Sequence, residues 1–215
     1  MLHGQSQLDC SPLLFRKIAA YTVRMGDERS ESFKSLSDLI HYGDPLPLSW
    51  AVEHGDAFRK DWLKSKDPAV LLWIAGHVIS SEKVVTVTVI IARMMLPHVA
   101  PENFWLFDRM IENAEKWTRG EVTSEDLKFF TDHAWFKRKN QSENQAENVI
   151  LNSVWASVSG TSPNASAAAR DAAEVLGTTP SGTKRIKAKL ARLVRQHIHV
   201  TVSDLARASK SGWSP

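Results

Sequence analysis

Apolar residues recur every three or four positions along most of this 215-residue chain, which is the period of one helix face. The pattern is strongest from Glu102 to Trp117, and Gly120 follows where a helix C-terminus commonly takes glycine. A capping residue precedes proline at Ser11-Pro12 and at Asp67-Pro68, an arrangement that favours a helix start. Thr123, with Asp126 three residues on, approximates a capping box and predicts another. The sequence therefore predicts an all-α fold, a bundle or array of about nine to eleven helices in a single domain, 1–215.

One segment, from Lys83 to Met95, also fits a strand, because its β-branched residues alternate with threonine. Its length, its helix-forming continuation from Ala92 to Leu96, and the absence of a second strand-like segment to pair with all favour a helix. The longest apolar run, Val84 to Val99, contains polar residues and proline and is shorter than the roughly 20 apolar residues of a membrane span. We therefore predict a buried core helix here and no membrane insertion.

Three other segments differ in character from the rest of the chain. Residues 1–45 carry the start and stop signals of two helices and predict an N-terminal helical hairpin. Residues 137–147 are polar, lack an apolar face and predict an exposed loop. The helix expected from Pro163 to Leu176 is rich in alanine, so we expect it to pack close to its neighbours, as small side chains allow.

Positive charge is concentrated in the C-terminal segment, 181–215, which we expect to form a basic helix. It contains eight basic residues and one acidic residue, a net +7, whereas the whole chain carries +3 and the remainder therefore −4. Such a segment is typical of a solvated helix face, and it also suits nucleic acid, anionic lipid or an acidic protein. The candidate basic patch consists of six residues: Lys184, Arg185, Lys187, Lys189, Arg192 and Arg195.

Cysteine usage and the N-terminal residues bear on the compartment. Cys10 is the single cysteine, so an internal disulfide is excluded and an oxidising compartment has no support. The first residues, up to Cys10, lack the basic and apolar regions of a secretory signal. We therefore expect a cytoplasmic protein.

The sequence contains no recognisable catalytic or metal-binding motif. The segment Gly177 to Lys184 differs from a phosphate-binding GxxxxGK[ST] loop, because lysine and the hydroxyl residue are exchanged and a helix precedes it in place of a strand. The eight histidines do not form HExxH or pair with cysteine at metal-site spacing. We therefore expect no enzymatic activity, cofactor or metal, although acids and bases from distant helices can meet in a cleft that spacing does not reveal.

The eight tryptophans bear on both burial and binding. Burying an indole stabilises a core strongly, at about 25 cal/mol per Å², so we expect core positions for most of them. Trp105 and Trp135 stand beside polar or charged residues, and tryptophan is enriched at the centres of protein interfaces. These two residues are therefore candidates for contact with a partner.

Four blocks between Leu48 and Leu127 form a further pattern. They are Leu48-Ser49-Trp50-Ala51 with Asp61-Trp62, the helix start from Asp67-Pro68 to Trp73, the helix Lys83 to Pro97, and Ile111 to Trp117 followed by Arg119-Gly120-Glu121 and a new helix to Leu127. In order and character these blocks, with the alanine-rich helices after them, resemble a family of helical bacterial immunity proteins, the Imm-5-like group, found beside polymorphic toxins. The segment Val85-Thr86-Val87-Thr88-Val89 departs from that family, which tends to have alanine and cysteine there.

The resemblance implies a cytosolic antidote that binds a cognate toxin and occludes its active site, without catalysis and without a cofactor. Its contact residues would be exposed aromatic and charged side chains, for which the candidates are Trp105, Asp108, Arg109, His133 and Trp135. The alternative is a nucleic-acid-associated helical protein that uses the basic C-terminal segment. The sequence leaves the oligomeric state open.

Overall fold

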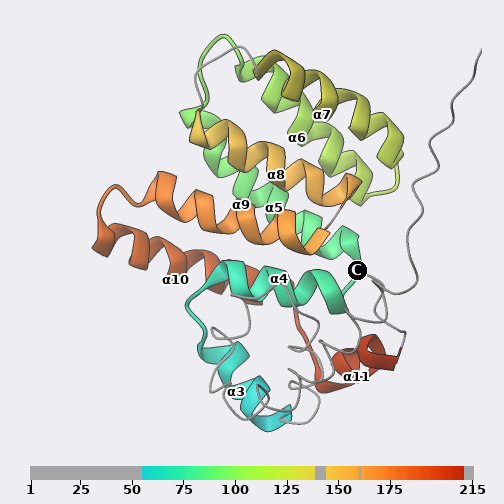
Figure 1. The fold of residues 1–215 in the computed structure, drawn as a ribbon, viewed down its shortest axis with the longest axis vertical. Coiled ribbons are helices and arrows are strands. Elements are labelled where there is room, and N and C mark those ends of the chain that lie inside the picture. The colour runs from blue at the N-terminus through green and yellow to red at the C-terminus, as the bar shows by residue number, and fades with distance from the viewer. Residues whose placement is uncertain (1–54, 139–143, 160, 211–215) are drawn as a thin grey trace, which may run out of the picture.

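A computed structural model describes residues 55–138, 144–159 and 161–210. Within these ranges the chain forms nine α-helices and one short 3-10 helix, and no strand occurs in them. The prediction of a single all-α domain is therefore confirmed (Figure 1). The hairpin predicted for residues 1–45 lies outside the described residues, as do Cys10 and Trp50.

The helices follow one another through short connections. Their bounds are α3 Gly55–Lys64, α4 Pro68–Val78, α5 Ser81–Met95, η2 Leu96–His98, α6 Phe104–Thr118, α7 Ser124–Arg138, α8 Gln145–Val158, α9 Thr161–Leu176, α10 Pro180–His197 and α11 Val202–Lys210. In Figure 1 the α6–α7 pair lies at the top, α5, α8 and α9 fill the middle, and α3 and α11 lie at the bottom. Helices α4 and α10 lie between the middle layer and that lower end.

Side-chain caps place several helix ends where the sequence predicts them. Asp67 accepts a hydrogen bond from the Ala69 amide at 3.0 Å, with Pro68 in the first turn of α4. At the start of α7, Thr123 and Asp126 bond each other's backbone amides at 2.9 and 3.2 Å, the reciprocal capping box. Gly120 takes a φ of +73°, a left-handed conformation that favours glycine after a helix end.

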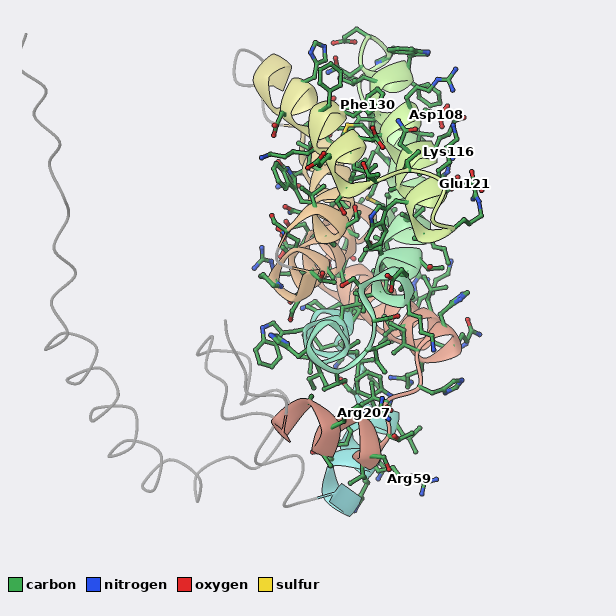
Figure 2. All side chains as sticks on the ribbon, turned by 90° about the vertical axis from the view of Figure 1, so that its right-hand side faces the viewer. Arg59, Asp108, Lys116, Glu121, Phe130 and Arg207 are labelled. Carbon is green, nitrogen blue, oxygen red and sulfur yellow. The ribbon has the colours of Figure 1, made fainter. Side chains whose placement is uncertain are left out.

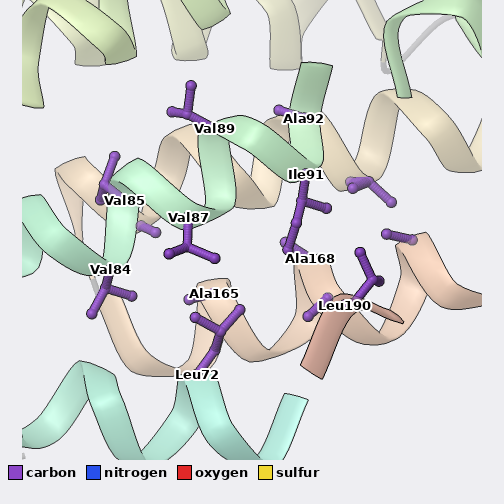
Figure 3. Close-up of a cluster of buried hydrophobic side chains, with 14 of the residues drawn as sticks. Leu72, Val84, Val85, Val87, Val89, Ile91, Ala92, Ala165, Ala168 and Leu190 are labelled. Carbon is purple, nitrogen blue, oxygen red and sulfur yellow. The ribbon is translucent and has the colours of Figure 1, made fainter. Parts of the chain in front are cut away.

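Helix α5 is the centre of the core, and the helical interpretation of its β-branched sequence is confirmed. Val84, Val85, Val87 and Ile91 are fully buried, and Figure 3 shows Val87 and Ile91 directed at the α9 alanines. Thr88 is also buried, and its hydroxyl donates to the Val85 carbonyl and to Ser153 O of α8, at 3.0 and 3.1 Å. Burial of most of the helix surface and hydrogen bonding of the buried Thr88 outweigh the local β propensity.

The close approach expected of the alanine-rich helix is confirmed where α9 meets α4. A Cβ added to Gly76 would lie 2.6 Å from Ser162 Cα, so the two backbones are in direct contact. Five alanines of α9 have no exposed surface: Ala165, Ala168, Ala169, Ala172 and Ala173. Small residues thus let α4 and α8 each pack closely against α9.

Two boundaries differ from the prediction. The polar stretch 137–147 is helical at both ends, because α7 continues to Arg138 and α8 begins at Gln145. Glu147 is only 2% exposed and accepts a hydrogen bond from Asn103 Nδ2 at 3.0 Å. The C-terminal segment forms two helices, α10 and α11, because Thr201 and Asp204 make a second capping box that starts a new helix.

No helix in the described ranges combines the length and the apolar character that a membrane span requires.

Candidate binding surfaces

The outward side of α6 presents one large aromatic among charges. Leu106, Phe107 and Met110 face the core, with Ile111 and Ala114. The opposite side carries Trp105, Arg109, Glu112 and Lys116, whose spacing of four, three and four residues defines one helix face. Trp105 is 68% exposed, an unusual position for the largest apolar side chain. We call these four residues the outer stripe of α6.

Arg93 of α5 forms ion pairs with two acidic residues at the edge of α6, Asp108 and Glu115. Its guanidinium donates to both Glu115 carboxylate oxygens, at 2.9 and 3.0 Å, and to Asp108. The hydrogen bond with Glu115 is the largest cause that raises the Arg93 pKa, and burial opposes it. Asp108, a predicted partner contact, therefore holds α6 against α5. Arg109 forms only an exposed pair with Glu112, at 2.8 Å within α6.

Helix α7 adds a second exposed aromatic to this end of the molecule. Phe129 is 72% exposed, and its ring meets the half-buried Phe130 ring edge-on with centroids 5.8 Å apart. Sequence reasoning missed Phe129, although adjacent residues on a helix point about 100° apart, so one of two neighbouring phenylalanines can face outward. His133 is exposed, and Trp135 lies in α7 with its side chain outside the described part. Figure 2 shows this end, with Phe130, Asp108 and Lys116 labelled.

We define the hairpin surface as the outer stripe of α6 together with Phe129 and His133 of α7. Its scaffold is tied at the turn between the helices, where Trp117 Nε1 donates to Ser124 Oγ at 3.0 Å. The Ser124 hydroxyl in turn donates to the Ser157 carbonyl of α8 at 3.3 Å. These two hydrogen bonds hold the α6–α7 turn against α8, so the exposed aromatic residues stand on an ordered backbone.

Helix α10 presents a surface of different chemistry. Leu190, Ala191 and Val194 are buried against the domain, and Arg185, Lys189 and Arg192 are exposed on the other side. Lys184 is exposed as well. Within the described ranges, no ion pair joins these four cations to an acidic group. We call Lys184, Arg185, Lys189 and Arg192 the cationic surface.

The other two members of the predicted basic patch serve the fold. Arg195 Nη1 donates to the Ser65 carbonyl at 2.6 Å and approaches the Trp62 carbonyl at 3.5 Å, which caps the end of α3. Burial, and then the charge of Arg192, lower the Arg195 pKa. Lys187 lies 3.7 Å from the Asp67 carboxylate. The patch is thus divided into four outward cations and two that attach α10 to its neighbours.

The C-terminal end of α3 adds positive charge close to α10. Lys64 and Lys66 flank Ser65, whose carbonyl accepts the Arg195 hydrogen bond, and both are exposed. Neither lysine forms an ion pair with a described acidic residue. Two exposed lysines therefore lie at the end of α3 that contacts α10 through Arg195.

A serine and a histidine meet inside the domain, where α4 packs on α9. Ser162 Oγ lies 2.8 Å from His77 Nδ1, and both groups lie 2.6 Å from the Trp73 carbonyl. Since a carbonyl only accepts, Nδ1 carries its proton there, and it cannot act as a base toward the serine. Burial lowers the His77 pKa, opposed by the bond to the Trp73 carbonyl. This geometry is that of a packing contact.

A shallow, open hollow of about 600 Å³ lies where η2, α8 and α9 meet. Polar side chains line much of it, including His98, Asn144 and Glu174. The Asn144 side chain is engaged, since it donates to the His98 carbonyl at 3.1 Å and caps α8. In the described part of the chain, no three histidine, cysteine or acidic residues are grouped so that they could hold a metal ion.

Comparison of the chain with protein-family models, with curated proteins and with solved structures finds no match. The resemblance to immunity proteins therefore stays a prediction from the sequence. The described residues present two chemically different surfaces, one with exposed aromatic rings and one cationic.

Proposed function

We propose that this chain is a non-enzymatic protein-binding scaffold whose contact face is the hairpin surface. The observation that carries the proposal is the exposure of Trp105 and Phe129, at 68% and 72%, on adjacent helices. Water contact with two large aromatic rings is unfavourable, and burying them in an interface recovers that free energy. Tryptophan is among the residues whose truncation weakens protein complexes most, by about 2 kcal/mol or more.

The rigidity of the hairpin supports the same proposal. Arg93 clamps the edge of α6 to α5, and the capping box of Thr123 and Asp126 fixes the start of α7. A surface that is ordered before it binds pays little conformational entropy on association. Asp108 takes a positioning role in this proposal, while Trp105, Arg109 and His133 remain contact candidates.

The specific form of the proposal is an immunity protein that occludes the active site of a cognate toxin. This form rests on the sequence resemblance between Leu48 and Leu127 and on the need of such an antidote for a rigid, complementary face. It requires no reaction on this chain, only a surface that excludes substrate from the toxin. The cytoplasm is the expected compartment, because that is where an antidote meets its toxin.

The test is calorimetric titration of the purified chain with the products of toxin-like reading frames beside its gene. The proposal expects a salt-resistant complex that Trp105→Ala and Phe129→Ala each weaken at least tenfold. Leu63→Ala is the matched control, because Leu63 is 59% exposed at the opposite end of the molecule. If neither aromatic substitution changes the affinity, the hairpin surface is not the contact face. If the chain binds none of these products, it is not an immunity protein for any of them.

A further inference from the structure

Several charges on the described surface are paired within the fold, whereas the four cations gathered on α10 are not. On α6 and its neighbours, Arg93, Arg109 and Arg119 each pair with a carboxylate within 3 Å. By contrast, Lys184, Arg185, Lys189 and Arg192 share one helix without any acidic partner among the described residues. Like charges on successive turns of a helix repel one another, and a polyanion bound along the helix would relieve that repulsion.

The geometry of the surface suits a repeating anion. Arg185, Lys189 and Arg192 are spaced four and three residues apart on one face, which places them along about 10 Å of the α10 axis. A nucleic acid duplex carries one negative charge per about 1.7 Å of its axis, so several phosphates lie within reach of these side chains. Lys64 and Lys66 continue the positive charge at the end of α3.

The residues of the cationic surface favour a nucleic acid duplex over other anionic partners. The apolar side of α10, with Leu190, Ala191 and Val194, is buried in the domain, so no apolar face is left to enter a lipid surface. None of the four cations has an aromatic neighbour on the outward face of α10, whereas single strands are bound by stacking on aromatic rings. An acidic protein partner would need an apolar or aromatic anchor at the centre of the contact, and this face has none.

We propose that the cationic surface of α10 binds the phosphate backbone of duplex nucleic acid without sequence preference. The contact is electrostatic, because arginine and lysine meet phosphate oxygens, and contacts to phosphate carry no sequence information. This surface is separate from the hairpin surface, so it adds a second activity that does not depend on the proposed protein partner.

The experiment is fluorescence anisotropy of a labelled duplex of arbitrary sequence, titrated with the full chain at several salt concentrations. Four phosphate contacts predict a slope of log affinity against log salt of about −3.6. Replacing Lys184, Arg185, Lys189 and Arg192 by glutamine should weaken binding at least tenfold and flatten the slope. Glutamine keeps the helix propensity of α10, and circular dichroism verifies that the variant is folded.

The control variant replaces four exposed cations elsewhere, Lys83, Arg119, Lys128 and Arg207, and so removes the same net charge. It should retain duplex affinity within about twofold, because we expect binding to depend on the four cations of α10 and only weakly on the net charge of the chain. No binding at low salt, equal weakening by both variants, or tighter binding to polyglutamate or to anionic vesicles than to the duplex would each overturn the proposal. Trp105→Ala should leave duplex binding unchanged, so failure of the protein-binding proposal is distinguishable from failure of this one.

Discussion

Helices α6 and α10 are both amphipathic, and their outward faces have opposite chemistry. Four of the five charged residues of α6 are paired, Asp108 and Glu115 with Arg93 and Arg109 with Glu112, and the most exposed large apolar side chain of α6 is Trp105. The outward charges of α10 are unpaired with described acids, and its outward face carries no aromatic side chain. Charge density alone therefore does not identify a binding surface; the partners that the fold supplies to each charge decide it.

The largest expected effect is a loss of stability from a substitution in the core, on which both α6 and α10 pack. Gly76→Ala should destabilise the protein by about 3 kcal/mol, because its Cβ would lie 2.6 Å from the backbone of Ser162. The measurement is the free energy of unfolding in urea. Gln196→Ala, on the exposed side of α10, is the control and should change stability by less than about 0.5 kcal/mol. A small effect of Gly76→Ala would mean that α4 and α9 can move apart cheaply.

Trp105→Ala tests whether the hairpin surface serves binding and not folding. It should lower the affinity for a protein partner by about 2 kcal/mol, roughly 30-fold, since truncating an exposed aromatic anchor removes apolar contact. Its unfolding free energy should stay within about 0.5 kcal/mol of the parent, because the side chain contributes little to the core. If the variant unfolds much more easily, Trp105 belongs to the packing and the comparison between the two faces fails.

Arg93→Met tests whether the charges of α6 are used by the fold. The variant should lose about 1–2 kcal/mol of stability, since Asp108 and Glu115 would keep their negative charge without a counter-ion. About a third of each side chain is exposed, so solvent screening keeps the loss below that of a fully buried pair. Arg192→Met, on the cationic surface, should be neutral in the same urea experiment. Equal losses in the two variants would mean that the charges of α6 contribute no more to stability than those of the cationic surface.

A smaller effect separates two arginines on α10 itself. Arg195→Gln should cost about 1 kcal/mol, because the Ser65 carbonyl at the end of α3 loses its charged donor, and Arg192→Gln should cost almost nothing. Amide hydrogen exchange gives the local readout: protection should fall in α3 for Arg195→Gln only. Unchanged protection of α3 would show that the Arg195 contact is not what holds this helix.

The smallest expected effect is a pH dependence of the free energy of unfolding. It comes from His77 in the core and involves neither the outward face of α6 nor that of α10. Burial lowers the His77 pKa below its ordinary value of 6.5, so below pH 6.5 the unfolded chain binds a proton that the folded chain does not. Stability should therefore decrease as the pH falls below 6.5 and level off once the pH is below the folded-state pKa. Urea unfolding at a series of pH values measures this slope, and His77→Gln should reduce it. A slope unchanged in His77→Gln would assign the acid sensitivity to other groups.

Local signals in the sequence predicted most of the helical layout. Caps at Asp67 and Thr123, the glycine at position 120 and the apolar period of three to four residues act within a few positions of one another, so they can be read without the fold. The same signals were present at Thr201 and Asp204, where a second capping box starts α11, and that helix was missed. Glu147 was misplaced in a loop because its burial depends on Asn103, which lies 44 positions away.

For the candidate contact residues, the sequence could not predict which side chains are engaged by other helices. Trp105 is exposed beside charges, as a partner contact requires, whereas Asp108 looked equivalent in sequence and is engaged by Arg93 of another helix. The hairpin surface gained Phe129, which lies off the apolar face that Leu127 and Phe130 share and whose exposure the structure gives as 72%.

By itself the sequence determined that this chain is helical, where most described helices start and end, and which side of each is apolar, because these properties depend on neighbours along the chain. Only the tertiary structure decided which charges remain available. Arg192 and Arg195 are three residues apart on one helix, yet Arg195 meets the Ser65 carbonyl 130 positions away and Arg192 meets no described acid. The free energy of a charge depends on everything within a few ångströms of it, and that surrounding is assembled only when distant helices pack.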